Sequence, residues 1–119
     1  MANVRLTFIQ PASFAADWSR LGLTDEDLRA LENSLMDRPE AGRSIVGTGG
    51  LRKSRFAPPL RHTGKSGAMR VGYLWLHQPA RIYLLIIFPK NEKADLSAAE
   101  RKYFRKWIEF IRWQVQHEE

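Results

Sequence analysis

Five basic residues in the middle of the chain are candidates for binding a phosphate group and reacting with it: Lys53, Arg55, Lys65, Arg70 and Lys90. The first two are separated by one residue in a segment that alternates like a strand, so their side chains share a face. Cations gathered on one surface bind nucleic-acid phosphates and stabilise the extra negative charge of a pentavalent phosphate. We therefore treat these five as a candidate site for a nucleic-acid phosphate. The alternative is that they are ordinary solvated surface charges.

The charge distribution favours the first interpretation. The chain has 119 residues and a net charge of +6. Residues 51–93 alone contain nine basic residues and one acidic residue, a net charge of +8, whereas the rest of the chain has a net charge of −2. Ordinary surfaces mix charges of both signs. A segment with almost no acidic residues is typical of a protein that binds a polyanion such as a nucleic acid.

The residue types also limit the chemistry. The chain has no cysteine and three scattered histidines, which excludes a disulfide framework, a thiolate nucleophile and a cysteine-ligated zinc site. We expect neither a metal nor a cofactor. A general base must then be a lysine, and a lysine among other cations gives up its proton more readily. Lys53 and Lys65 are the two candidates; His62 is a weaker one because its Pro-flanked loop offers no obvious partner.

Periodicity predicts the elements that must position these residues. Strands are predicted at 4–8, 51–57, 69–77 and 81–88, the last two as an antiparallel hairpin. The continuous apolar run within 81–88 predicts a central strand buried on both faces. Two short helices are predicted between Pro11 and Pro39, and a longer helix after a capping box at 97–100. This order predicts one α+β domain over residues 1–119, with two N-terminal helices and a C-terminal helix packed on a mostly antiparallel sheet.

Two glycine-containing segments need separate interpretation. The glycines of 47–50 could form a nest for an anion, although a turn or bulge is the more common use of such a cluster. The segment 64–66, Gly-Lys-Ser, is not a phosphate-binding P-loop. Pro59 stands where the first glycine of that motif is required, and a strand follows the segment where a helix is required.

No segment suggests a membrane or a secreted protein. The longest apolar run, 83–88, is far shorter than the roughly 20 residues of a membrane-spanning helix. The first eight residues contain no apolar stretch followed by a cleavage site, so we see no signal peptide. We therefore expect an intracellular domain with no membrane partner.

Four segments together resemble the signatures of the RelE/HigB superfamily of bacterial toxins. They are GTGGLRKSR at 47–55, GKSG at 64–67, RVGY at 70–73 and KNEKADL at 90–96. The strongest similarity is to the HigB-like branch, and it extends from about residue 8 through the last helix. The resemblance implies the RelE-like toxin fold, whose element order agrees with the order predicted above.

The resemblance also implies a function. Toxins of this kind belong to type II toxin–antitoxin pairs and cut mRNA in the ribosomal A site, in the cytoplasm and without a metal. The substrate's own 2′-hydroxyl attacks the adjacent phosphate, and a cognate antitoxin, here expected to be a HigA-like helix-turn-helix protein, silences the toxin. The family's active-site cations correspond to Lys53, Arg55, Arg70 and Lys90, and Lys65 corresponds to the basic loop of the branch.

Further residues of the basic segment are assigned smaller roles. Arg52, Arg61, His62 and Lys93 are candidate contacts to RNA or the ribosome. Tyr73 corresponds to a strand tyrosine that we expect to be structural. Well-studied relatives have an arginine where this chain has Asn91, which leaves open the residue that protonates the leaving group.

Two other functions and two antitoxin surfaces remain open at this point. A toxin of the same fold could inhibit DNA gyrase, as ParE-like toxins do, or the chain could bind nucleic acid or repress its own operon without catalysis. An antitoxin could cover the cationic sheet face with an acidic segment. It could instead bind the acidic hairpin at 11–38 or the last helix around Trp113.

Overall fold

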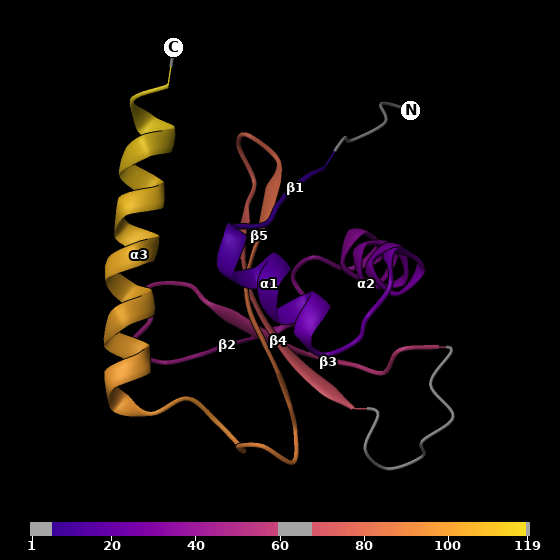
Figure 1. Cartoon of the computed structure of the whole chain (residues 1–119). Helices are drawn as coiled ribbons and strands as arrows, with labels where there is room; N and C mark the ends of the chain where they lie inside the picture. The colour runs from indigo at the N-terminus through magenta and orange to yellow at the C-terminus, as the bar shows by residue number, and fades with distance from the viewer. Residues whose placement is uncertain (1–5, 60–67, 119) are drawn as a thin grey trace.

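The computed structural model describes residues 6–59 and 68–118. Its elements follow the predicted order, with one addition (Figure 1). They are β1 (Thr7–Ile9), α1 (Ala12–Arg20), α2 (Asp25–Asp37), β2 (Arg43–Ser44), β3 (Arg52–Phe56), β4 (Met69–Leu76), β5 (Arg81–Pro89) and α3 (Ala98–Gln116). Strand β1 is shorter than the predicted strand at 4–8, of which residues 4 and 5 lie outside the described residues.

The strands form one five-stranded sheet in the order β1-β5-β4-β3-β2. Strand β1 runs parallel to β5, and the other pairs are antiparallel. The α+β prediction is therefore confirmed. Strand β5 lies between β1 and β4 and buries residues on both of its faces, which explains its continuous apolar run.

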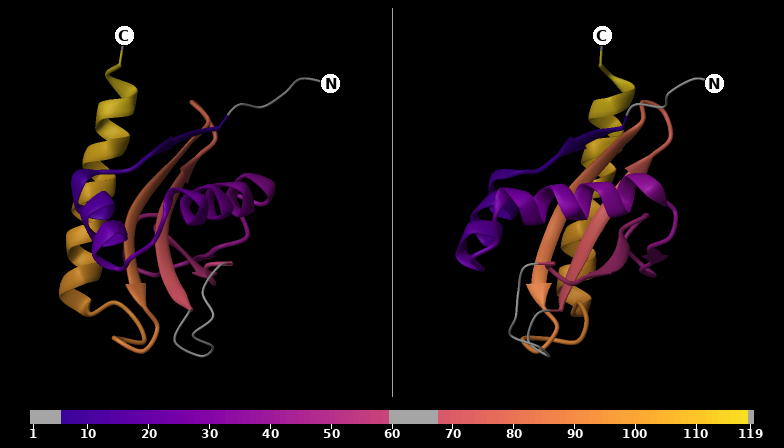
Figure 2. Two further views of the ribbon diagram at one scale, coloured as in Figure 1. Left: turned by 45° about the vertical axis from the view of Figure 1, so that its right-hand side comes forward. Right: turned by 90° about the vertical axis from the view of Figure 1, so that its right-hand side faces the viewer.

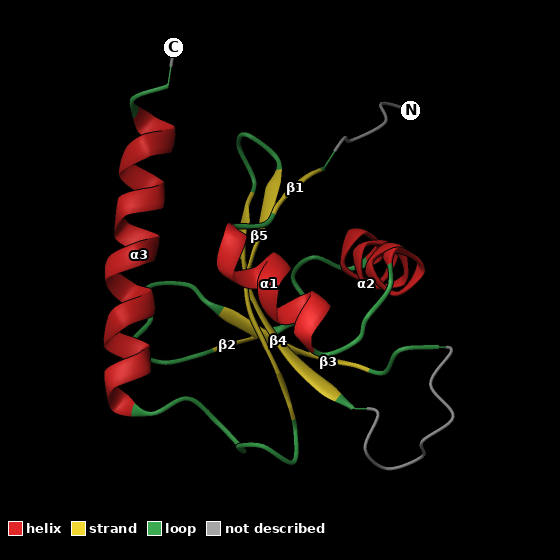
Figure 3. Cartoon of the chain, viewed as in Figure 1, coloured by secondary structure: helices red, strands yellow, loops and turns green. Residues whose placement is uncertain are grey.

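The sheet lies between two helical layers, and each face has its own apolar core (Figures 2 and 3). Helices α1 and α2 cover one face, where Phe14 and Leu31 pack against Val71 and other strand residues. Helix α3 covers part of the opposite face, where Ile108 packs with Leu74 and their neighbours. On this second face, beside the part that α3 covers, lie the side chains of Lys53, Arg55 and Arg70.

Local signals in the sequence explain where the helices begin. The Thr24 hydroxyl accepts a hydrogen bond from the Asp27 N–H at 3.1 Å, and the Asp27 carboxylate accepts one from the Thr24 N–H at 2.9 Å. Ser97 and Glu100 form the same reciprocal capping box at the start of α3, as predicted. No helix in the described part of the chain is both long and apolar enough to cross a membrane.

The glycine cluster forms the turn between β2 and β3. Gly47, Gly49 and Gly50 all have positive φ values, between +76° and +127°, a conformation that side chains disfavour. The Thr48 hydroxyl, fully buried, donates to the Ile45 carbonyl at 2.6 Å and accepts from the Leu51 N–H at 3.0 Å. These bonds give the cluster a structural role in the turn.

Candidate phosphate-binding site

Strand pairing brings three of the predicted cations to one face of the sheet. Arg55 on β3 lies directly opposite Arg70 on β4, and Lys53 lies opposite Gly72. Paired residues share a face of the sheet. The three side chains line an open hollow of about 450 Å³, which is wide enough to receive a segment of an extended polyanion.

A fourth cation that the sequence analysis missed also lines this hollow. Arg43 on the short strand β2 pairs with Lys53 across the sheet edge and shares its face. The expected turn at 42–50 contains β2, but a two-residue strand is too short to leave an alternating pattern. A basic residue just before a glycine cluster was the only available signal.

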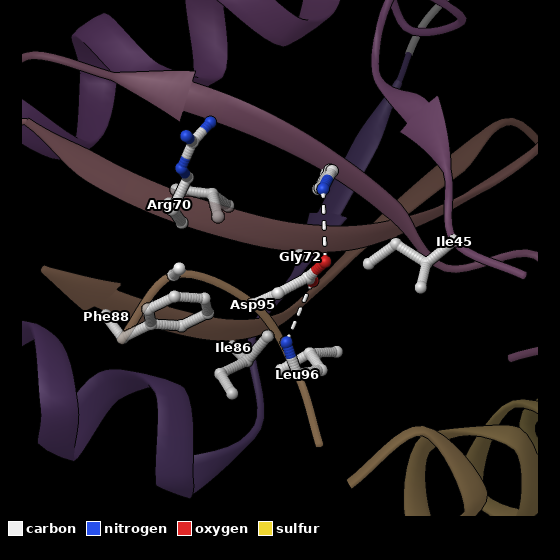
Figure 4. Close-up of a pocket in the computed structure, with 10 residues that line it drawn as sticks. Ile45, Arg70, Gly72, Ile86, Phe88, Asp95 and Leu96 are labelled. Atoms are coloured by element: carbon white, nitrogen blue, oxygen red, sulfur yellow. Dashed lines mark hydrogen bonds and ion pairs between the residues drawn. The ribbon is translucent and has the colours of Figure 1, made fainter. Parts of the chain in front are cut away.

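The floor beneath Lys53 and Arg70 is packed and mostly apolar (Figure 4). It is lined by Gly72, Ile86 and Phe88 among others, and the space open to water is about 10 Å³, room for about one water molecule. A Cβ atom added at Gly72 would lie only 2.6 Å from Cγ2 of Ile86. The absence of a side chain at Gly72 therefore permits the close packing of the floor that Lys53 borders.

An acidic residue from outside the basic segment 51–93 also lies at the site. The Asp95 Oδ2 atom lies 3.6 Å from Lys53 Nζ and 3.9 Å from the guanidinium of Arg101, on the first turns of α3. Its other oxygen accepts a hydrogen bond from the Leu96 N–H at 2.8 Å. That hydrogen bond, with smaller contributions from the two cations, lowers the pKa of Asp95 against an opposing effect of burial. Asp95 is therefore an anion at neutral pH.

Arg70 has unused hydrogen-bonding capacity. It is half-buried, and its Nε atom is enclosed without a hydrogen-bond partner among the described residues. Its register partners are Arg55 on one side and Phe88 on the other, so no acidic strand residue is paired with it. Its guanidinium lies at the hollow and keeps donors for a ligand.

The predicted residues Lys90 and Lys93 do not line this hollow. Lys90 is exposed directly after β5, where its N–H donates to the Ala68 carbonyl at 3.2 Å. Lys93 forms an ion pair with Glu100, and its ammonium lies 4.9 Å from the centre of the Phe88 ring. Lys65, Arg61 and His62 lie outside the described residues.

Arg52 faces the opposite side of the sheet. It pairs with buried Tyr73, and its Nη1 atom donates to the carbonyls of Glu40 and Gly42, each at 2.8 Å. Its guanidinium also lies 5.9 Å from the ring centre of Trp75. Arg52 therefore anchors the segment that leads into β2, and it does not line the hollow.

Tyr73 has the structural role that was expected. Its hydroxyl donates to the Pro39 carbonyl at 2.7 Å and accepts from the Gly42 N–H at 2.9 Å. Burial raises the pKa of Tyr73 above its usual value, against smaller opposing effects of the Gly42 hydrogen bond and of Arg52, so the hydroxyl remains protonated at neutral pH. It holds the chain just before Arg43 against the sheet.

No protein-family model matches the chain. Within residues 6–59 and 68–118, no group of three or more His, Asp or Glu side chains is placed to hold a metal ion. The function is therefore argued from the cations around the hollow and from the sequence motifs.

Proposed function

We propose that this protein is a toxin of the RelE/HigB type that cuts mRNA on the ribosome. One observation carries the proposal: Lys53, Arg55 and Arg70 occupy neighbouring positions of two paired strands and line one open hollow. A phosphate that bridges adjacent nucleotides fits such a set of donors. Two of the four sequence signatures include these residues, and all four support the same function.

The proposed reaction needs no external nucleophile. The 2′-oxygen attacks the adjacent phosphorus as its proton passes to a base, and the bond from phosphorus to the 5′-oxygen breaks. The 5′-oxygen takes up a proton, which leaves a 2′,3′-cyclic phosphate and a 5′-hydroxyl. Of the two candidate bases, Lys65 is proposed for this role, because Lys53 is paired with the Asp95 carboxylate and would bind the RNA backbone as a cation. Arg55 and Arg70 would stabilise the additional charge on the phosphate in the transition state.

The partners belong to the same proposal. mRNA would reach the hollow in the ribosomal A site, in the cytoplasm, and a HigA-like antitoxin would block that access. Arg43 would extend the cationic surface along the RNA backbone towards the sheet edge. Lys90 and Lys93, at the end of β5 and beyond it, would meet RNA or ribosome outside the hollow.

Induced expression in bacteria, followed by primer extension on abundant transcripts, tests the proposal. We expect growth arrest and new RNA 5′ ends with the wild-type chain. Arg70→Ala should reduce cutting by about 10²–10³, the usual effect of removing a donor to a charged transition state. The matched control is Arg20→Ala, because Arg20 is an exposed arginine on α1 that forms an ion pair with Asp17 and does not line the hollow.

Three outcomes would contradict the proposal. If the Arg70→Ala variant cut transcripts as fast as the Arg20→Ala variant, the hollow would have no part in the mechanism. DNA damage without transcript cuts would indicate a gyrase inhibitor. RNA binding without cuts in any transcript would indicate a binding protein with no catalytic activity.

A further inference from the structure

Two cations from different elements converge on one oxygen of Asp95. Lys53 comes from β3 and Arg101 from α3, and both reach Oδ2 of the same carboxylate. Asp95 is labelled in Figure 4. A carboxylate and a phosphate oxygen are bound by the same donors, since both present a localised negative charge. The position of Oδ2 is therefore a position at which an anion is stabilised.

The contacts to Asp95 are loose. The distances of 3.6 and 3.9 Å exceed the length of a normal hydrogen bond. The side chains of Lys53, Asp95 and Arg101 are 35%, 46% and 40% exposed. Exposed pairs of this kind contribute little to stability. Both cations have long side chains, so they can turn to another anion while the loop keeps its hydrogen bond to Leu96.

Arg101 also has an unused donor. Its Nε atom is enclosed and has no hydrogen-bond partner among the described residues, although its terminal nitrogen approaches Asp95. An arginine that meets a single carboxylate oxygen at long range leaves most of its five N–H donors free. A phosphate group has several acceptor oxygens, so it can accept hydrogen bonds from more of the Arg101 donors than the single Asp95 oxygen does.

The position is continuous with the hollow described above. Lys53 and Arg70 line both the open hollow and the packed floor that Asp95 borders. An RNA strand bound over Arg55 and Arg70 therefore passes next to Lys53, and its neighbouring phosphate meets the Asp95 carboxylate. Repulsion between the phosphate and the Asp95 carboxylate would weaken RNA binding, unless Lys53 and Arg101 turned from the carboxylate to the phosphate.

We propose that Lys53 and Arg101 form a second subsite for an RNA backbone phosphate, and that the Asp95 carboxylate is a built-in counter-ion that competes with RNA for it. The inference rests on the proposed function and adds a residue of α3 to the RNA-binding surface. Asp95 lowers the affinity for RNA and holds the two cations in position when no RNA is bound.

Removal of the Asp95 charge is the central test. In Asp95→Asn the amide oxygen can still accept the Leu96 N–H, so the loop geometry is kept. Affinity is measured by fluorescence anisotropy with a labelled single-stranded RNA whose 2′-hydroxyls are methylated, because this ligand cannot be cut. We expect the affinity for RNA to rise by about three- to tenfold, which is the scale set by the loss of two exposed ion pairs. The matched control is Glu92→Gln, which makes the same charge change in the same loop at an exposed residue.

The salt dependence separates competition from a general change in charge. In the wild type Asp95 already neutralises the subsite, so RNA releases few counter-ions there. In Asp95→Asn the freed cations neutralise one more RNA phosphate, the counter-ion condensed on that phosphate is released, and the slope of log K against log salt should steepen by about 0.7 per phosphate. Glu92→Gln should leave the slope unchanged. Circular dichroism checks that each variant is folded.

A second pair of variants tests Arg101. In the Asp95→Asn background, Arg101→Gln should cancel most of the gain, whereas Arg105→Gln, one turn further along α3, should not. An affinity of Asp95→Asn equal to or below that of Glu92→Gln would overturn the inference while leaving the cutting activity as evidence for the proposed function. If Asp95→Asn increased the affinity for an oligoglutamate peptide but not for RNA, that result would also overturn the inference. Absence of RNA binding by every variant would overturn this inference, whereas the proposed function is decided separately by the cutting of transcripts in cells.

Discussion

Loss of the Tyr73 hydroxyl should destabilise the protein through one enclosed donor. Tyr73→Phe keeps the fully buried ring but removes two hydrogen bonds, one to Pro39 and one from Gly42. The bond from the Gly42 N–H is buried, so this group would be left without a partner, at a cost of about 1–3 kcal/mol. The bond to the Pro39 carbonyl is only part-buried, and water can replace it at a cost of about 0.5 kcal/mol.

Together these effects predict that the free energy of unfolding falls by about 1.5–3.5 kcal/mol. Urea unfolding followed by circular dichroism measures the change, with an unchanged m-value expected because the same surface is exposed. The matched control is Tyr103→Phe, because Tyr103 is 61% exposed on α3; it should change stability by less than about 0.5 kcal/mol. Equal losses in the two variants would refute the reasoning that the buried Gly42 N–H depends on Tyr73.

Three further predictions concern the same fold. Burial raises the pKa of Tyr73, so the protonated hydroxyl stabilises the fold fully below the ordinary tyrosine pKa. This stabilisation is lost as the pH rises through the pKa of Tyr73 in the folded protein. In urea titrations, the wild type should therefore lose stability above about pH 10 more steeply than Tyr73→Phe. Gly72→Val would force a side chain against Ile86 and should cost about 1–3 kcal/mol in thermal melts; a variant as stable as wild type would show that the floor can expand. Thr24→Ala removes the cap that holds the Asp27 N–H and should cost about 1 kcal/mol by urea unfolding, with no effect on RNA binding.

The sequence was sufficient wherever the signal was local. The two-residue alternation of Lys53 and Arg55 put them on one face because strand geometry requires it. The apolar run of β5 predicted an inner strand, and the capping box at 97–100 marked the start of α3. Each of these features depends on neighbours within a few residues, so the pattern along the chain was enough to predict it.

Tertiary structure decided which distant residues share the site. Arg43 joins it only because β2 pairs with β3 in one register, and Arg52 leaves it because a shift of one residue along a strand changes the face. Asp95 and Arg101 were absent from the sequence prediction, since they come from a loop and a helix outside the basic segment. Their convergence on Lys53 depends on how α3 packs against the sheet. Such contacts are set by packing between elements, and no periodicity in the chain encodes them.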